Sequence, residues 1–256
     1  LYSDQEIFLR ELVSNAVDAT QKMKTLKNIG ELNTDITKLR VEVILDKKNK
    51  TLTIRDNGIG MTDKELDKYI NQIAFSGAEE FINKYKDADV NNSIIGHFGL
   101  GFYSAFMVSK NVEIITKSQR PNSKPIKWSC DGSPSYSMEE VKKKTKGTDI
   151  ILHIADDSTE FLEEQRITSI LNKYCKFLPV QIKFGEKTEK IDDPKGKKDK
   201  EGAIIKIDQI SDNIVNNTDP AWTKRPSNLK ENDYKNFYKE LYPMEFSDPL
   251  FHIHLN

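Results

Sequence analysis

Three polar side chains near the start of the chain have the types and spacing to act together. Glu11, Asn15 and Asp18 occur at i, i+4 and i+7 in the stretch ELVSNAVDA, so a helix would carry them on one stripe. An asparagine oxygen can ligate Mg²⁺, and a nearby carboxylate can deprotonate a water molecule as a general base. A solvated helix face is the alternative, and for an isolated trio it is the commoner case. The apolar residues lie on the opposite side: Leu9, Leu12, Val13 and Ala16.

A glycine-rich loop further along the chain could bring phosphate groups to this stripe. Gly96, Gly99 and Gly101 have the order GxxGxG, which differs from the dinucleotide pattern GxGxxG and lacks the GK[ST] of a P-loop. Glycines let backbone N–H groups approach anionic oxygens, and a helix that starts after them adds a favourable dipole. Glycine clusters also mark ordinary turns, so this loop alone is a weak signal.

The hexapeptide DNGIGM, residues 56–61, is a third candidate. Asp56 ends a predicted strand, and its carboxylate could accept a hydrogen bond from an exocyclic amine. Gly58 and Gly60 would let the backbone pass close to a flat ring, with Met61 packed on it. By itself the hexapeptide is more typical of a tight turn.

Several elements must position these residues. The pattern predicts a helix over 4–27, a β-hairpin over 39–54, a short helix over 62–73 and another helix opening in 94–106. Strands are predicted at 112–116, 127–130, 148–154 and 180–184, with a helix ending at Pro179 before the last one. Because strands and helices do not alternate regularly, we expect an α+β fold rather than a doubly wound parallel sheet.

The composition bounds the function. The 256 residues are 37% hydrophobic and 31% charged, which is typical of a soluble globular protein with one full domain and part of another. The net charge of −1 argues against nucleic acid or an anionic membrane as partner, and no apolar run is long enough to span a bilayer. The two cysteines, Cys130 and Cys175, are too few for a disulfide framework and suit a reducing compartment.

A polar segment divides the chain. Residues 185–202 contain almost nothing apolar and mix both signs of charge, so they are predicted to be a solvated linker. A strand at 203–207 and an aromatic-rich stretch follow it. We therefore expect a first domain over 1–184, a charged linker over 185–202 and the beginning of a second domain over 203–256.

Taken together, and in this order, the motifs resemble the GHKL ATPase superfamily. The ordered pattern is ExxxNxxDA, DxGxG, GxxGxG, and then Gly147 and Thr148 opening a strand. This superfamily includes gyrase-type topoisomerases, mismatch-repair ATPases, histidine kinases and the heat-shock protein 90 chaperones. Longer strings resemble the last of these, nearest to its bacterial form, high-temperature protein G: IFLRELVSNAVDA, DNGIGM, IGHFGLGFYSAFMV, GTDIILHI, EFLEEQRI, DPAWTKRP and FYKELYPMEFSDPLFHIHLN.

The resemblance implies a two-layer nucleotide-binding fold, with helices on one face of a twisted, mostly antiparallel sheet. It implies that Glu11 is the general base, that Asn15 ligates Mg²⁺ and phosphate, and that Asp56 accepts the adenine amine. The remaining positions implied to bind ATP or ADP are Asp18, Lys22, Gly60, Met61, Gly99, Gly101, Phe102 and Thr148.

The resemblance also implies a lid over residues 71–101 that closes over the nucleotide. Two positions depart from the family pattern: Phe75 replaces a lysine and Tyr69 an asparagine, so no nucleotide contact is carried over to them. His97 within the glycine loop is more typical of packing than of a phosphate ligand. His252 and His254 lack the third ligand that a zinc site needs.

At the level of activity, the resemblance implies an ATP-dependent cytoplasmic chaperone of the stress response. Its partners would be unfolded or partly folded client proteins and a second copy of the chain, joined through a C-terminal domain outside this sequence. The family's first strand and helix precede Leu1, and its completing arginine follows Asn256, so we expect nucleotide binding with very weak hydrolysis. The alternatives are a DNA-topology or mismatch-repair ATPase, a histidine kinase catalytic domain and a nucleotide sensor without turnover.

Overall fold

The computed structural model describes residues 4–72, 77–85, 94–96, 99–192, 194 and 206–255. Its strands are β1 (Arg40–Asp46), β2 (Thr51–Asp56), β3 (Ser109–Lys117), β4 (Ile126–Cys130), β5 (Ser137–Glu140), β6 (Gly147–Ile154), β7 (Gln181–Asp192) and β8 (Lys206–Ile214). The α-helices are α1 (Ile7–Asn28), α2 (Asp63–Leu66), α3 (Gly77–Lys84), α4 (Glu164–Tyr174) and α5 (Glu231–Leu241). Shorter helical turns are a π-helix at Asp67–Asn71 and 3₁₀ turns at Gly101–Met107, Thr159–Leu162, Ala221–Thr223 and Pro226–Asn228.

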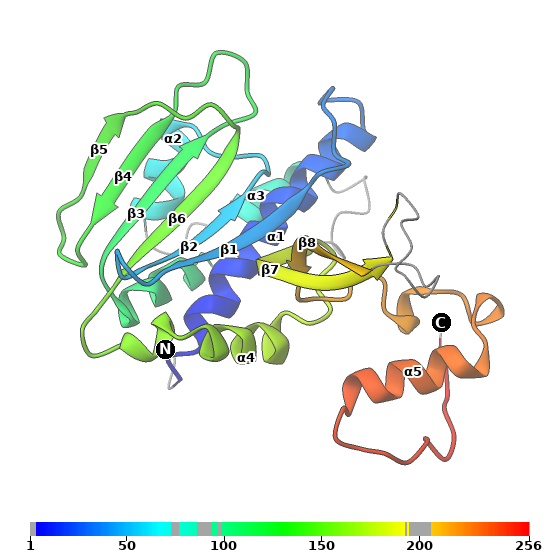
Figure 1. Ribbon diagram of the computed structural model, residues 1–256. Coiled ribbons are helices and arrows are strands. Elements are labelled where there is room, and N and C mark those ends of the chain that lie inside the picture. Colours follow the sequence, from blue (N-terminus) through cyan, green and yellow to red (C-terminus); the bar gives the residue numbers. More distant parts are fainter. Residues whose placement is uncertain are drawn as a thin grey trace.

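These strands form one eight-stranded sheet in the order β5-β4-β3-β6-β2-β1-β7-β8. Neighbouring strands are antiparallel except β1 and β7, which run parallel. Helices cover one face of the sheet, so the predicted α+β two-layer fold is confirmed (Figure 1). The β1–β2 hairpin was predicted too, because its apolar residues alternate, and Val43 lies opposite Ile54.

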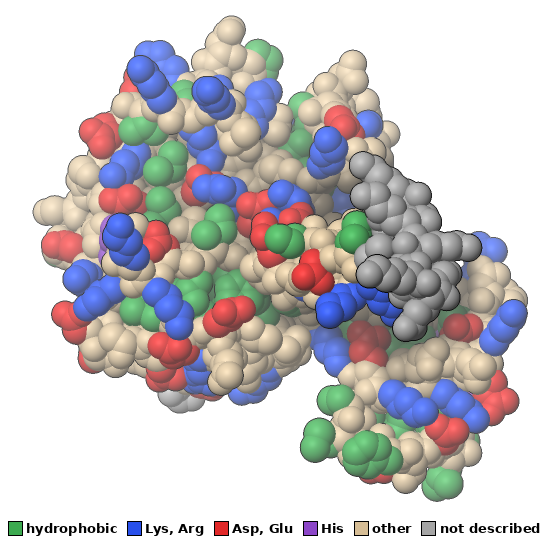
Figure 2. All heavy atoms as spheres, viewed as in Figure 1, with side chains coloured by type: hydrophobic (Ala, Val, Ile, Leu, Met, Phe, Trp, Pro, Cys, Tyr) green, Lys and Arg blue, Asp and Glu red, His purple; other side chains and the backbone are tan. Residues whose placement is uncertain are grey.

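The hydrophobic core lies between the sheet and the helices. Phe8, Leu12 and Ile167 from α1 and α4 are fully buried against inward residues of the strands, such as Ile54 and Leu152. The opposite face of the sheet carries interspersed charged side chains of both signs (Figure 2). This two-sided pattern follows from the period of two along each strand.

Some element boundaries differ from the predicted ones. Helix α1 begins at Ile7 rather than near Asp4, whose Oδ1 instead accepts the backbone N–H of Glu6 at 3.0 Å. The short helix after DNGIGM begins as predicted, because Thr62 and Glu65 form a reciprocal capping box. It then continues as a π-helix, which the apolar spacing did not indicate. Helix α4 ends at Tyr174, before the predicted stop at Pro179.

The polar segment after residue 184 begins as a strand. β7 continues to Asp192 and pairs with β8, so the segment predicted to be a solvated linker begins with residues that are mostly exposed but paired in the sheet. Backbone pairing needs no apolar side chains, which explains why composition did not reveal it. Of the strand predicted at 203–207, only residues 206 and 207 lie within the described residues, and both belong to β8. The proposed division into two domains and a linker stays a prediction.

The last part of the chain packs on the end of α4. Phe177 contacts Trp222 and Phe237 through edge-to-face rings, with centroids 4.7 and 5.8 Å away. Helix α5 lies away from the sheet, beyond the β7–β8 pair (Figure 1). No helix in the described ranges is long and apolar enough to cross a membrane.

Candidate functional site

One cavity of about 1350 Å³ lies between α1, the inner face of β2 and β6, and the segments that follow β2. All residues that the sequence singled out as catalytic or nucleotide-binding line it: Glu11, Asn15, Asp18, Lys22, Asp56, Gly60, Met61, Gly99, Gly101, Phe102 and Thr148. They come from four separate parts of the chain, so only the folded structure brings them together. Their individual roles stay predictions.

Asp56 is the buried acid of this cavity. It is the last residue of β2, lies opposite Thr148 of β6 in the sheet register, and is 6% exposed. Its Oδ1 accepts the backbone N–H of Gly58 at 2.7 Å. Burial raises the pKa of Asp56 to about 7, although hydrogen bonds from the backbone of Gly58 and Thr148 favour the charged form. The carboxyl is therefore poised to change charge near neutral pH.

The backbone after Asp56 passes tightly beside neighbouring strands. Gly60 has a φ of +62°, and a Cβ there would lie 2.1 Å from the backbone oxygen of Lys117. The Met61 N–H donates to Thr116 Oγ1 at 2.9 Å, and that hydroxyl lies 3.0 Å from Thr148 Oγ1. The glycine that the sequence suggested for a close approach is thus required by the sheet itself.

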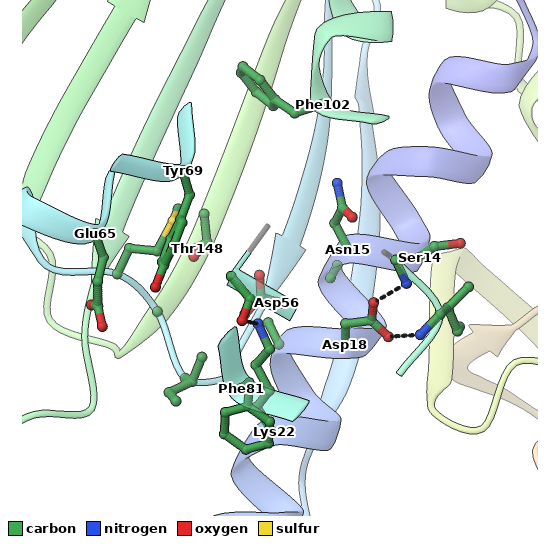
Figure 3. A pocket seen from close by; sticks show the side chains of 18 of the residues that line it. Ser14, Asn15, Asp18, Lys22, Asp56, Glu65, Tyr69, Phe81, Phe102 and Thr148 are labelled. Atoms are coloured by element: carbon green, nitrogen blue, oxygen red, sulfur yellow. Dashed lines mark hydrogen bonds between the residues drawn. The ribbon is translucent and has the colours of Figure 1, made fainter. Parts of the chain in front are cut away.

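Glu11 and Asn15 lie on the α1 wall of the cavity. Arg10 holds Glu11 through its Nη2, 2.5 Å from Glu11 Oε1. A Cβ on Gly101 would lie 2.3 Å from Glu11 Oε2, so any other residue here would displace this carboxylate. Figure 3 shows Asn15 and Asp18 projecting from α1, with the Asp18 carboxylate turned toward the loop at Ile95 and Gly96 rather than toward Asp56.

Asp18 is engaged with the glycine-rich loop. Its Oδ1 accepts the N–H of Ile95 at 2.8 Å and its Oδ2 accepts the N–H of Gly96 at 2.7 Å (Figure 3). A Cβ on Gly96 would lie 3.2 Å from Asp18 Oδ2 and 3.3 Å from Asn15 Oδ1. In this arrangement Asp18 holds the loop against α1, a contact that the sequence did not reveal.

Lys22 lies one turn beyond Asp18 and contacts helix α3. Its Nζ donates to the Gly77 carbonyl at 3.0 Å and lies 5.7 Å from the centre of the Phe81 ring. Burial lowers the pKa of Lys22, and the charge of Asp18 partly opposes this.

The residues to which the sequence assigned no ligand-binding role lie in different parts of the structure. Tyr69 lines the cavity and donates its hydroxyl to Glu80 Oε2 at 2.8 Å, whereas Phe75 and His97 lie outside the described residues. His252 stacks on Tyr234, whose hydroxyl lies 2.9 Å from His254 Nδ1. Within the ranges that the structure describes, no group of three or more His, Cys, Asp or Glu residues could hold a metal ion.

Sequence reasoning missed several residues of the cavity. Arg10 was not singled out, although its place beside Glu11 in the sequence was a usable signal. Glu65 and Arg120 also line the cavity, and their side chains pair at 2.6 Å across a gap of 55 positions in sequence. No local pattern could have joined these two residues, because the pairing depends on how the chain folds back.

The residues present fit a nucleotide accompanied by Mg²⁺. Asn15 offers the kind of oxygen donor that Mg²⁺ prefers, and Mg²⁺ commonly combines few protein ligands with phosphate and water oxygens. Gly101 leaves the space beside Glu11 that a side chain would fill. Ile54, Ile114 and Ile150 supply an apolar wall next to the buried Asp56, as a flat base would require.

Comparison with known proteins agrees with this geometry. Residues 183–256 match the family described as Hsp90 protein. The chain is 59% identical to proteins named chaperone protein HtpG of Bacteroides fragilis strain YCH46 and Bacteroides thetaiotaomicron, and 55% identical to that of Porphyromonas gingivalis strain W83. Each alignment covers 100% of this chain and 35% of the relative, so the chain spans about a third of their length.

A second match covers the part of the chain that forms the cavity. Residues 2–159 match the family described as histidine kinase-, DNA gyrase B-, and HSP90-like ATPase. This match extends over more than half of the chain and includes Glu11, Asn15, Asp56 and Thr148. The chain therefore belongs to the family of histidine kinase-, DNA gyrase B- and HSP90-like ATPases.

Proposed function

We propose that this chain binds and slowly hydrolyses ATP as the nucleotide-binding part of an ATP-dependent molecular chaperone. The observation that carries the proposal is the cavity in which buried Asp56 and the pair Glu11 and Asn15 face one space. The names of the relatives, chaperone protein HtpG, favour a chaperone over a topoisomerase or a histidine kinase. The net charge of −1 favours protein clients over nucleic acid.

The base would bind at the Asp56 end. The ionised carboxylate accepts a hydrogen bond from the exocyclic amine of adenine, with one oxygen still bonded to the Gly58 N–H. Thr148 lies beside it at the same strand end, and Met61 and Ile150 contact the ring faces. A buried acceptor of this kind discriminates against a base without the amine, because the hydrogen bond from the amine to the carboxylate would then be lost.

The phosphates would bind at the Glu11 end. Asn15 presents an amide oxygen, and the backbone at Gly99 and Gly101 can approach anionic oxygens closely. Mg²⁺, when bound, would neutralise phosphate charge and favour attack on the γ-phosphate. Glu11 orients a water molecule and takes its proton as the general base, while Arg10 holds that carboxylate in place.

The steps proposed to follow nucleotide binding involve regions that the longer relatives have in addition to this chain. Closure of the segment over residues 71–101, of which 73–76, 86–93 and 97–98 lie outside the described residues, would exclude water, and client proteins would respond to the two nucleotide states. A homodimer formed through a C-terminal domain, and an arginine beyond residue 256 that completes hydrolysis, are part of the same proposal. The relatives' greater length supports this, since this chain covers 35% of each.

Calorimetry with ADP and Mg²⁺ tests the pocket. The unchanged chain is expected to bind ADP, and Asp56→Asn to lose at least about tenfold in affinity because the amide places a donor against the adenine amine. Glu11→Ala should keep its ADP affinity and lose hydrolysis of ATP. Full ADP affinity in Asp56→Asn would refute the base-binding assignment.

A further inference from the structure

A cluster of ion pairs lies on the outer face of the sheet, at the same strand ends that carry Asp56 and Thr148. Asp149 Oδ1 accepts Arg55 Nε at 3.0 Å and Lys143 Nζ at 2.9 Å. Asp149 Oδ2 also lies 3.4 Å from Arg55 Nη2. Arg55 belongs to β2, Asp149 to β6, and Lys143 to the segment between β5 and β6.

The sheet register places this cluster directly behind the two cavity residues. Asp56 lies opposite Thr148, and Arg55 lies opposite Asp149, one position earlier in β2 and one position later in β6. Because successive side chains point to opposite faces, Asp56 and Thr148 point into the cavity while Arg55 and Asp149 point away from it. The adjacency of β2 and β6 is visible in Figure 1.

Lys143 extends the cluster to the turn that wraps the end of β2. The Lys117 Nζ donates to the Lys143 carbonyl at 3.2 Å, which fixes the backbone of this segment to β3. Gly147 follows with a φ of +107°, and a Cβ there would lie 2.2 Å from the Asp56 backbone oxygen. The segment from Lys143 to Asp149 therefore determines how closely β6 approaches Asp56.

The burial of Lys143 and Asp149 separates their contact from ordinary surface ion pairs, and the 47% exposed Arg55 is a second partner of the same buried carboxylate. The side chains of Lys143 and Asp149 are 8% and 11% exposed, whereas Lys50 and Asp156, at the other end of the same strands, are 54% and 77% exposed. A desolvated ion pair with several hydrogen bonds holds its geometry tightly, while an exposed pair contributes little. The rigid end of β2 and β6 is the end that faces the cavity.

We propose that Arg55, Asp149 and Lys143 are positioning residues for base recognition, which they perform by fixing Asp56 against Thr148 from the opposite face of the sheet. This inference rests on the proposed function, since it assigns Asp56 to the adenine amine. None of the three lines the cavity. Their effect is on the alignment of the Asp56 carboxylate, and hence on discrimination between bases.

The test compares two nucleotides, ADP and inosine diphosphate, on the 256-residue chain. Inosine diphosphate lacks the exocyclic amine, so the ratio of the two affinities reports Asp56 recognition and is insensitive to phosphate binding. In Arg55→Met and in Asp149→Asn the ADP affinity is expected to fall about tenfold, with inosine diphosphate changed less than about twofold. Arg55→Lys keeps the charge but not the planar fork. Its ratio of ADP to inosine diphosphate affinity should therefore lie between that of Arg55→Met and that of the unchanged chain.

Asp156→Asn and Lys50→Met are the matched controls, because they break an exposed ion pair just beyond the other ends of the same two strands. Both should keep the ADP to inosine diphosphate affinity ratio of the unchanged chain.

An unchanged affinity ratio in Arg55→Met and Asp149→Asn, whether both nucleotides bind as before or both lose affinity equally, would overturn the positioning role. If Asp149→Asn does not fold, Arg55→Met decides, since Arg55 is 47% exposed and Asp149 keeps Lys143. Failure of the unchanged chain to bind ADP would instead refute the proposed function.

Discussion

At the scale of single residues, Asp56 combines burial with a small set of backbone donors. Its raised pKa of about 7 means that the folded protein binds a proton more tightly than the unfolded chain, whose aspartate titrates near 3.8. The folded state is therefore favoured at low pH by this group. That contribution is lost as the pH rises from about 4 to about 7, because ionisation is then easier in the unfolded chain.

The same titration predicts a pH dependence of nucleotide binding. The adenine amine needs an ionised acceptor, so ADP affinity should rise as the pH increases through about 7. Calorimetry at a series of pH values between 6 and 8 measures this. Asp56→Asn removes the titrating group and serves as control, since any remaining slope comes from the phosphates. Parallel slopes in both proteins would rule out Asp56 as the source.

At the scale of elements, Gly60 of DNGIGM lies where a left-handed backbone passes close to β3. Gly60→Ala should destabilise the fold by at least about 2 kcal/mol, because a left-handed φ and a backbone clash with Lys117 act together. Gly30→Ala is the matched control: its φ is +79°, with nothing within 4 Å of a new Cβ. It should cost only about 1 kcal/mol. Urea unfolding of both variants tests the difference, and equal losses would show that the clash is relieved.

The contact of Asp18 with the glycine-rich loop gives a second prediction at this scale. Asp18→Ala removes both acceptors for the backbone N–H groups of Ile95 and Gly96. Hydrogen exchange at these two amides should accelerate by at least about tenfold, since a charge-assisted bond is lost at each. The amide of Ile150 in β6 is an internal reference and should not change. Unaltered exchange at Ile95 and Gly96 would mean that the loop is held by other contacts.

At the scale of the whole molecule, Glu6 joins the start of α1 to α4. Its carboxylate accepts Arg166 Nη1 at 2.6 Å and Lys173 Nζ at 2.8 Å. The hydrogen bond from Lys173, followed by that from Arg166, lowers the pKa of Glu6. A lowered pKa in the folded state stabilises the protein above the unfolded value, near 4.5, and this contribution is lost as the pH falls below it.

Glu6→Gln should therefore reduce the free energy of unfolding at pH 7 by about 1 kcal/mol, a modest value because the partners are partly solvated. The difference from the unchanged chain should shrink below pH 4. Glu163→Gln is the control, since Glu163 is 66% exposed and pairs with Lys47, which is 56% exposed. A loss in Glu6→Gln no greater than in the control would remove Glu6 from the contacts that join the helices.

Local sequence signals predicted the strands whose apolar residues alternate regularly and the helix whose first turn carries a capping box. The alternating residues of the β1–β2 hairpin and the capping box of Thr62 needed no tertiary information. Strand β5 was missed because Ser137–Glu140 is mostly exposed at the sheet edge and carries no apolar alternation. The strand at residues 185–192 was missed for the same reason, since its pairing is made by the backbone.

By itself the sequence determined which side chains could do chemistry, since Glu11, Asn15 and Asp18 share one helix stripe and Asp56 ends a strand. It also determined the glycines that the close backbone approaches require. Only the tertiary structure decided that these groups surround one cavity, that Asp18 binds the loop at Ile95 and Gly96, and that Asp149 backs Asp56. The physical reason is that helix and strand periods act over a few residues, whereas cross-strand register and burial join residues far apart in the chain.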